Sequence, residues 1–238
     1  MDHGDREEVR YQVLMLKKPL FIRILLILLI FAVYLLADMP LIYLWKKNGT
    51  LIPSTQASSD LPGILFQNLI IVIVPILIFV LFLLALKNDF VEEMYLRIKG
   101  MWQWVGVLVL MAGLAGILIY HLITQEDKIT AIYLLFYYVF IIAFTEEFIC
   151  RDVCTYFLKN EKTIIRFVVP NLFFAVMHIF NYSGWGAMTG EYIISFIRND
   201  MIVLFFVGCM NQALKEKTGT IWIPVLLHAA WDFALAYN

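Results

Sequence analysis

Two adjacent carboxylates and an arginine lie inside a long, largely apolar stretch of the chain. Residues 129–158 are mostly Tyr, Phe, Ile, Val and Ala, yet they include Glu146, Glu147 and Arg151. An ionisable side chain at membrane depth costs roughly 2.5–3.5 kcal/mol on insertion scales, so such residues are usually paired or functional. Glu147 and Arg151 are spaced i,i+4, which places them on one helix face where they can pair. Glu146 lies about 100° around the helix, so its partner must come from another segment.

Two further apolar segments carry histidines at helical spacing. His178 follows Phe174 by one turn, and His228 lies on the same helix face as Asp232. Counted from the expected ends of their segments, Glu146, His178 and His228 lie roughly 14–18 Å deep, near the middle of a hydrocarbon core of about 30 Å. Several polar side chains at one depth indicate a functional site inside the membrane.

These side chains could activate water in two ways. A carboxylate beside a neutral imidazole can take a proton from water, and a second imidazole can stabilise an oxyanion. The same side chains are also ligands for a divalent metal ion, which would lower the pKa of a bound water. Spacing alone does not decide between the two, because the helical H-E-x-x-H metal motif is absent.

The composition indicates that membrane helices position these residues. The chain of 238 residues is 62% hydrophobic and 16% charged, with a mean hydropathy of +0.82, whereas soluble domains are about 45–50% apolar and about 25% charged. The excess falls in runs of about 17–23 residues, which span a bilayer as helices. We therefore expect an all-α polytopic bundle, one integral-membrane domain over 1–238, with about seven transmembrane helices. The expected spans are 20–37, 64–86, 102–123, 129–158, 166–180, 200–213 and 220–237.

The connections and flanking charges add further expectations. Pro75 predicts a kink in the second span, and 183–199 is either a short interfacial helix or part of the sixth span. Lys and Arg gather on the loops that share a side with the N-terminus. The positive-inside rule therefore predicts a multi-pass protein, in the cell membrane, with the N-terminus cytoplasmic and the C-terminus outside. No basic block suggests a nucleic acid partner. The three cysteines, in or beside apolar runs, read as small buried residues.

A second copy of the first pattern serves as an internal comparison. Glu92-Glu93-x-x-x-Arg97 repeats the spacing of two carboxylates and an arginine, but it lies in a charged connector at 87–99. A solvated ion pair there explains the pattern without a function. The pattern is therefore informative only at membrane depth. His121, near the end of the third span, is expected to be interfacial.

The three motifs in their order resemble those of a known family. Glu-Glu-x-x-x-Arg, Phe-x-x-x-His and His-x-x-x-Asp, over 146–232, resemble the CAAX-processing and bacteriocin-processing family (CPBP or Abi) of intramembrane proteases, whose eukaryotic branch is the Ras-converting CAAX endopeptidase. The resemblance implies a hydrolase that cleaves a peptide bond of a peptide or protein substrate within or at the lipid bilayer. Peptide maturation and bacteriocin self-immunity are the biological roles that the family suggests.

The resemblance also implies roles for individual residues. Glu146 and His178 would activate the water. The side chains implied as catalytic are Glu146, Glu147, His178, His228 and Asp232, and the supporting ones are Arg151, which pairs with Glu147, and Phe174, which packs. His228 and Asp232 would stabilise the oxyanion or complete a metal site. Asp232 stands where many members have Asn, and an ionised Asp only accepts hydrogen bonds. We therefore expect Asp232 to orient His228.

The sequence leaves alternatives open for both the cofactor and the class of function. Family members are described both as glutamate-dependent enzymes and as metalloproteases. One divalent metal ion such as zinc, held by Glu146, His178 and His228, and a metal-free mechanism are therefore both open. A proton-coupled transporter could use the same buried groups, although the chain lacks the paired broken helices that are usual in transporters. A non-catalytic immunity protein that binds a peptide toxin is the third class.

Overall fold

The computed structural model describes residues 18–86, 89–183 and 189–237. Within these ranges the regular structure is helical throughout and no strand occurs, which confirms the predicted all-α membrane bundle. Five of the described helices are long and apolar enough to cross a membrane, or six if one bent pair counts as a single span. The charged residues expected at 1–17 lie outside the described residues.

The first span is longer than predicted. Helix α2 (Leu20–Lys47) continues through Pro40, where the sequence suggested a loop after residue 37. A proline removes one backbone donor, but apolar residues resume immediately after it. In a lipid environment, keeping the remaining backbone hydrogen bonds within one helix is cheaper than exposing them. The expected end at residue 37 was therefore wrong.

The second span is bent, as predicted from Pro75. After the short η1 (Ser54–Ser59), helices α3 (Leu61–Ile71) and α4 (Ile73–Leu86) meet at Val72 with an angle of 47°. Pro75 has no N–H for the carbonyl of Ile71, and its ring clashes with that same carbonyl. The break therefore falls one turn before the proline rather than at it.

The helix that carries Glu146 and Glu147 spans the bundle as predicted but is irregular inside. It runs without a gap over Lys128–Leu158. Its segments are α7 (Lys128–Phe136), the π-helical η3 (Tyr137–Ala143), α8 (Phe144–Glu147), the π-helical η4 (Phe148–Val153) and α9 (Cys154–Leu158). The two glutamates thus occupy one α-helical turn between two π-helical segments. Such π-segments are frequent at functional sites because they change which side chains share a face.

The next two long segments favour one of the two alternatives left open for 183–199 and correct one expected helix end. Helix α10 is Thr163–Ser183, and a continuous run over Gly190–Thr218 contains α11 (Gly190–Phe196), the π-helical η6 (Ile197–Met201) and α12 (Ile202–Thr218). Residues 190–199 therefore belong to the span and do not form a separate interfacial helix, while 184–188 lie outside the described residues. Lys215 was expected in a turn, but the helix runs to Thr218 and ends at Gly219, whose φ of 69° is the usual left-handed helix end.

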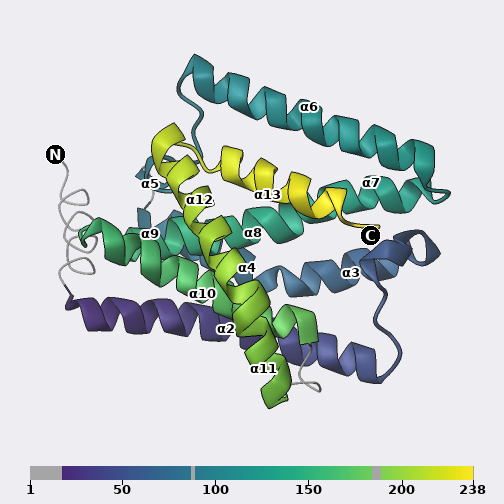
Figure 1. Cartoon of the computed structure of the whole chain (residues 1–238), viewed down its shortest axis with the longest axis horizontal. Helices are drawn as coiled ribbons and strands as arrows, with labels where there is room; N and C mark the ends of the chain where they lie inside the picture. Colours follow the sequence, from purple (N-terminus) through teal and green to yellow (C-terminus); the bar gives the residue numbers. More distant parts are fainter. Residues whose placement is uncertain (1–17, 87–88, 184–188, 238) are drawn as a thin grey trace.

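The last helix is shorter than the span expected at 220–237. Helix α13 (Trp222–Ala234) has 13 residues, about 20 Å at 1.5 Å per residue, against a core of about 30 Å. It packs between α6 (Met101–Thr124) and the 128–158 helix, and α12 crosses the bundle at a steep angle (Figure 1). His121 of α6 is buried, and its Nε2 lies 2.9 Å from the carbonyl of Phe233, near the end of α13.

The predicted orientation can be tested by labelling. Glu126 and Asn160 are both exposed, at opposite ends of the 128–158 helix. In a Cys209→Ser background, Glu126→Cys should react with a membrane-impermeant maleimide in intact cells. Asn160→Cys should react only after permeabilisation. Cys150 and Cys154 are free but buried, so their background should be low. The opposite labelling pattern would reverse the assigned orientation.

Candidate active site

The residues singled out by motif converge in the interior of the bundle. Glu146, Glu147 and Arg151 lie on the 128–158 helix, Phe174 and His178 on α10, and His228 and Asp232 on α13. The two glutamates, the arginine and His178 are buried, with at most 7% of each residue exposed. The side chains of His228 and Asp232 are 12% and 27% exposed. Three helices therefore bring the three motifs to one place.

Glu146 faces His178 across a gap slightly longer than a hydrogen bond. Its Oε2 lies 3.6 Å from His178 Nε2 and has no hydrogen-bond partner among the described residues. His178 Nδ1 lies 2.7 Å from the Phe174 carbonyl, which can only accept, so this nitrogen carries the proton. In the neutral imidazole, Nε2 then presents a lone pair toward Glu146. Two acceptors thus face the same small space.

Glu147 is held by three partners from three helices. Its Oε1 lies 3.0 Å from His228 Nδ1 and 3.0 Å from the amide nitrogen of Asn211, and its Oε2 lies 3.2 Å from Arg151 Nε. Neither Glu147 nor Arg151 has any exposed surface. The two neighbouring glutamates therefore have different environments, one compensated by a cation and two further donors, the other facing a single imidazole.

Arg151 is bound mainly by charge and by an aromatic ring. Its guanidinium carbon lies 4.3 Å from the centre of the Phe174 ring, and its nitrogens make no hydrogen bond of good geometry within the described part of the chain. A Cβ on Gly208 of α12 would come within 3.1 Å of Arg151 Nη2 and 2.6 Å of Asn171 Oδ1. Glycine at 208 therefore lets α12 approach closely enough to enclose the charged pair.

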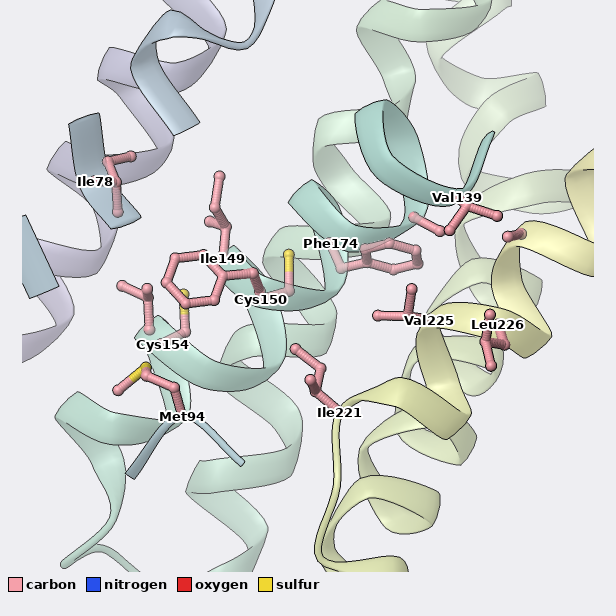
Figure 2. Close-up of a cluster of buried hydrophobic side chains, with 14 of the residues drawn as sticks. Ile78, Met94, Val139, Ile149, Cys150, Cys154, Phe174, Ile221, Val225 and Leu226 are labelled. Atoms are coloured by element: carbon pink, nitrogen blue, oxygen red, sulfur yellow. The ribbon is translucent and has the colours of Figure 1, made fainter. Parts of the chain in front are cut away.

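Phe174 packs against both histidines and the arginine. Its ring centre lies 4.6 Å from that of His178 and 6.1 Å from that of His228, both edge-on. Together with the Arg151 contact, this places one ring against a side chain of each motif. Figure 2 shows Phe174 among the buried apolar side chains that also include Val139 and Val225. The ring thus packs against Arg151, His178 and His228.

His228 is flanked by two carboxylates, and this arrangement bears on metal binding. Its Nδ1 faces Glu147, and its Nε2 lies 3.4 Å from Asp232 Oδ2. Neither ring nitrogen is therefore directed at the pair formed by Glu146 and His178. Within the described residues, no group of three His, Cys, Asp or Glu side chains is arranged to hold a metal ion.

Helix α12 has a buried polar face that belongs to none of the three motifs and was not predicted from them. Gly208, Asn211, Gln212 and Lys215 are buried at helical spacing in an otherwise apolar segment. Gln212 bonds Asn171 at 2.9 Å, and Lys215 lies 2.5 Å from Asp152 and also donates to the Arg151 carbonyl. The spacing i, i+3, i+4, i+7 was the available signal. We call these four residues the α12 polar stripe.

Two cavities lie away from this cluster. An apolar one of about 290 Å³ lies between α4 and the 128–158 helix. Its walls include Phe144 and Phe148, each two residues from Glu146 and therefore on roughly the opposite helix face. A polar one of about 210 Å³ lies where α9 and α12 end, and its cations are paired, for example Lys159 with Glu93 at 3.0 Å. Neither cavity contains the paired carboxylate and imidazole.

The fold and the site together define a helical membrane protein with a buried carboxylate–histidine centre. Residues 128–234 match the family model described as type II CAAX prenyl endopeptidase Rce1-like. This stretch is a little under half of the chain and contains all three motifs, so the predicted resemblance to this family is confirmed. The family supports a protease acting at the membrane. No curated protein and no solved structure matches the chain significantly.

The Glu147–Arg151 pair should be essential for stability. Arg151→Met would leave a buried carboxylate uncompensated, which costs about 3–5 kcal/mol when one partner of a buried pair is lost. We expect a large fall in the thermal unfolding midpoint of the detergent-purified protein. The double variant Glu147→Gln/Arg151→Met should recover much of that loss.

The exposed arginine of the repeated pattern provides the control for this experiment. Arg97 lies 3.3 Å from Glu92, and both side chains are largely exposed. Arg97→Met should therefore change the midpoint little. Equal effects of Arg97→Met and Arg151→Met would contradict the structural role given to the buried pair.

Proposed function

We propose that this protein is an intramembrane endopeptidase in which Glu146 and His178 activate a water molecule to hydrolyse a peptide bond. The observation that carries the proposal is the arrangement of Glu146 Oε2 and His178 Nε2. They lie 3.6 Å apart in a buried setting, and the carboxylate oxygen has no other hydrogen-bond partner in the described part of the chain. The family match to membrane proteases supports the reaction class.

The two facing acceptors favour a water molecule as the reacting group. A water between them would donate one hydrogen to each acceptor, because a carboxylate and an Nε2 lone pair can only accept. Both of its lone pairs would then face away from the acceptors, toward a substrate carbonyl. Donating both hydrogens to basic groups raises the nucleophilicity of the oxygen, which is general base catalysis.

The remaining steps follow from the same groups. The water oxygen bonds to the carbonyl carbon as its proton passes to Glu146, and the carbonyl oxygen becomes an oxyanion. Collapse of this intermediate breaks the C–N bond, and the proton held by Glu146 goes to the leaving amine. His228 Nε2 lies 3.4 Å from Asp232, a longer contact than Nδ1 makes with Glu147. With Nδ1 held by Glu147, a protonated Nε2 is the ring donor left for the oxyanion, which would compete with Asp232 for it.

Glu147 and Asp232 have positioning roles in this proposal. The charge of Glu147 is compensated by Arg151, and its Oε1 already contacts His228 and Asn211, so Glu147 is a weaker base than Glu146 in this proposal. Its contact with Nδ1 fixes the orientation of the His228 ring, as the carboxylate of a catalytic triad does for its histidine. Asp232 would limit the rotation of the same ring from its other side. The substrate would be a peptide or protein segment delivered at the membrane.

The proposal is tested by comparing cells that express the wild type or Glu146→Gln at matched membrane levels. Membrane-bound and secreted peptides are profiled by mass spectrometry. We expect new peptide termini with the wild type and none with Glu146→Gln, since the amide cannot accept the proton of the water. His178→Gln should reduce the same termini by at least about a hundredfold, the lower range for loss of general base assistance.

Glu92→Gln is the matched control, because Glu92 is an exposed member of the repeated pattern that pairs with Lys99 and Arg97. It should leave the peptide profile unchanged. Identical profiles for wild type and Glu146→Gln, with any phenotype retained in the variant, would contradict proteolysis and favour the binding or transport alternatives.

A further inference from the structure

We propose that Asn211 is a positioning residue of the active site, acting on His228 through Glu147. The inference deepens the proposed function, on which its kinetic part rests. Asn211 belongs to none of the three motifs, yet its amide nitrogen donates to Glu147 Oε1 at 3.0 Å. The same oxygen contacts His228 Nδ1, also at 3.0 Å. One carboxylate oxygen thus joins an amide on α12 to an imidazole on α13.

Asn211 determines which oxygen of Glu147 faces His228. Arg151 binds the other oxygen, Oε2, at 3.2 Å. A carboxylate with a cation on one oxygen and a single donor on the other could rotate to bring both oxygens toward the guanidinium. The second donor on Oε1 opposes this rotation, because a buried charge-assisted hydrogen bond contributes about 1.5–3 kcal/mol. Asn211 therefore keeps Oε1 directed at the histidine.

The rest of the α12 polar stripe holds Asn211 at the correct height and rotation. Gln212, the next residue, is bonded to Asn171 and to the Arg166 carbonyl, both at 2.9 Å. One turn further on, Lys215 pairs with Asp152 at 2.5 Å and donates to the Arg151 carbonyl. These contacts attach α12 to both α10 and the η4 segment that carries Arg151. The amide of Asn211 is thus presented from a fixed helix.

The burial of Asn211 supports a specific role for its amide. The residue is 2% exposed, and its Oδ1 makes no hydrogen bond within the described residues. A buried amide with an unsatisfied oxygen is unfavourable by itself, by about 1–3 kcal/mol. A leucine at this position would avoid that penalty in an apolar helix. The bond from its nitrogen to Glu147 is the contact that accounts for an asparagine here.

The direct test follows the chemical reactivity of individual histidines. The purified protein is treated with diethylpyrocarbonate, and modification of His228, His178 and His121 is followed by peptide mass spectrometry. We expect Asn211→Ala to raise the modification rate of His228 several-fold, because the ring is no longer held by a fixed carboxylate. His121, which bonds the Phe233 carbonyl away from Glu147, should keep its rate. An unchanged His228 rate, or a parallel rise at His121, would overturn the proposal.

The kinetic test uses the substrate identified with the wild type. Asn211→Ala should lower kcat about ten- to a hundredfold, the loss typical for residues that orient a site ligand through a hydrogen bond, and leave KM within about twofold. Asn211→Leu has a similar size, adds no charge and removes the donor, so it should lower kcat as well. It also serves as a second variant if the alanine protein does not fold. A change confined to KM would contradict a positioning role.

The matched control is Asn199→Ala, since Asn199 is exposed and its side-chain hydrogen bonds in the described structure go to Arg198 and Ser195 on its own helix. It should change neither histidine reactivity nor kcat. The reactivity test and the kinetic test can fail independently of each other. If the wild type shows no proteolysis, the proposed function fails, while the reactivity of His228 still decides whether Asn211 positions it.

Discussion

A fully buried ion pair between Glu147 and Arg151 is the interaction on which the rest of this structure depends. Either charge alone would be strongly unfavourable in a membrane interior. Together they require a setting in which the guanidinium is covered and the carboxylate oxygens are satisfied. The ring of Phe174 and the bare backbone at Gly208 provide the cover. Asn211 and His228 satisfy the carboxylate. One pair thus links α10, α12 and α13 to the 128–158 helix.

This pair also explains how two adjacent glutamates can differ in chemistry. Glu147 faces the Arg151 cation through Oε2 and has two partners on Oε1, so its negative charge is compensated. Glu146 has an oxygen that lacks a hydrogen bond among the described residues and faces an imidazole at 3.6 Å. Partly unsatisfied buried groups are unfavourable for stability and are retained where they serve a function. Both glutamates lie in the α-helical turn α8, where consecutive side chains are about 100° apart and so point to these different surroundings.

The sequence predicted the bundle and the motif residues because both depend on simple rules. Long apolar runs must be helical in a membrane, and charges at a common depth stand out against them. The sequence predicted the ends of the helices less accurately. The end at residue 37 and the turn at Lys215 were wrong, because a proline or lysine near a span end resembles a boundary when burial is unknown.

The polar stripe on α12 shows what depends on three-dimensional contacts. Asn211 and Gln212 are uncharged, and Lys215 lies close to the end of its helix, so each resembles an interfacial residue in sequence. Only the packing of α12 shows that all three are buried against the charged segment. In the same way, α13 was expected to span 220–237 but has 13 residues. Its length could not be read from hydropathy alone.

We infer that the two adjacent glutamates have different roles. Glu147 stabilises the fold, and Glu146 takes part in the chemical reaction. The most direct measurement compares the thermal unfolding midpoints of detergent-purified Glu146→Gln and Glu147→Gln with that of the wild type. We predict that Glu146→Gln unfolds at or above the wild-type temperature, because the substitution removes a buried charge whose Oε2 has no hydrogen-bond partner among the described residues. Glu147→Gln should unfold well below it, because Arg151 loses its counter-charge. Equal midpoints for the two variants, or the reverse order, would contradict the account.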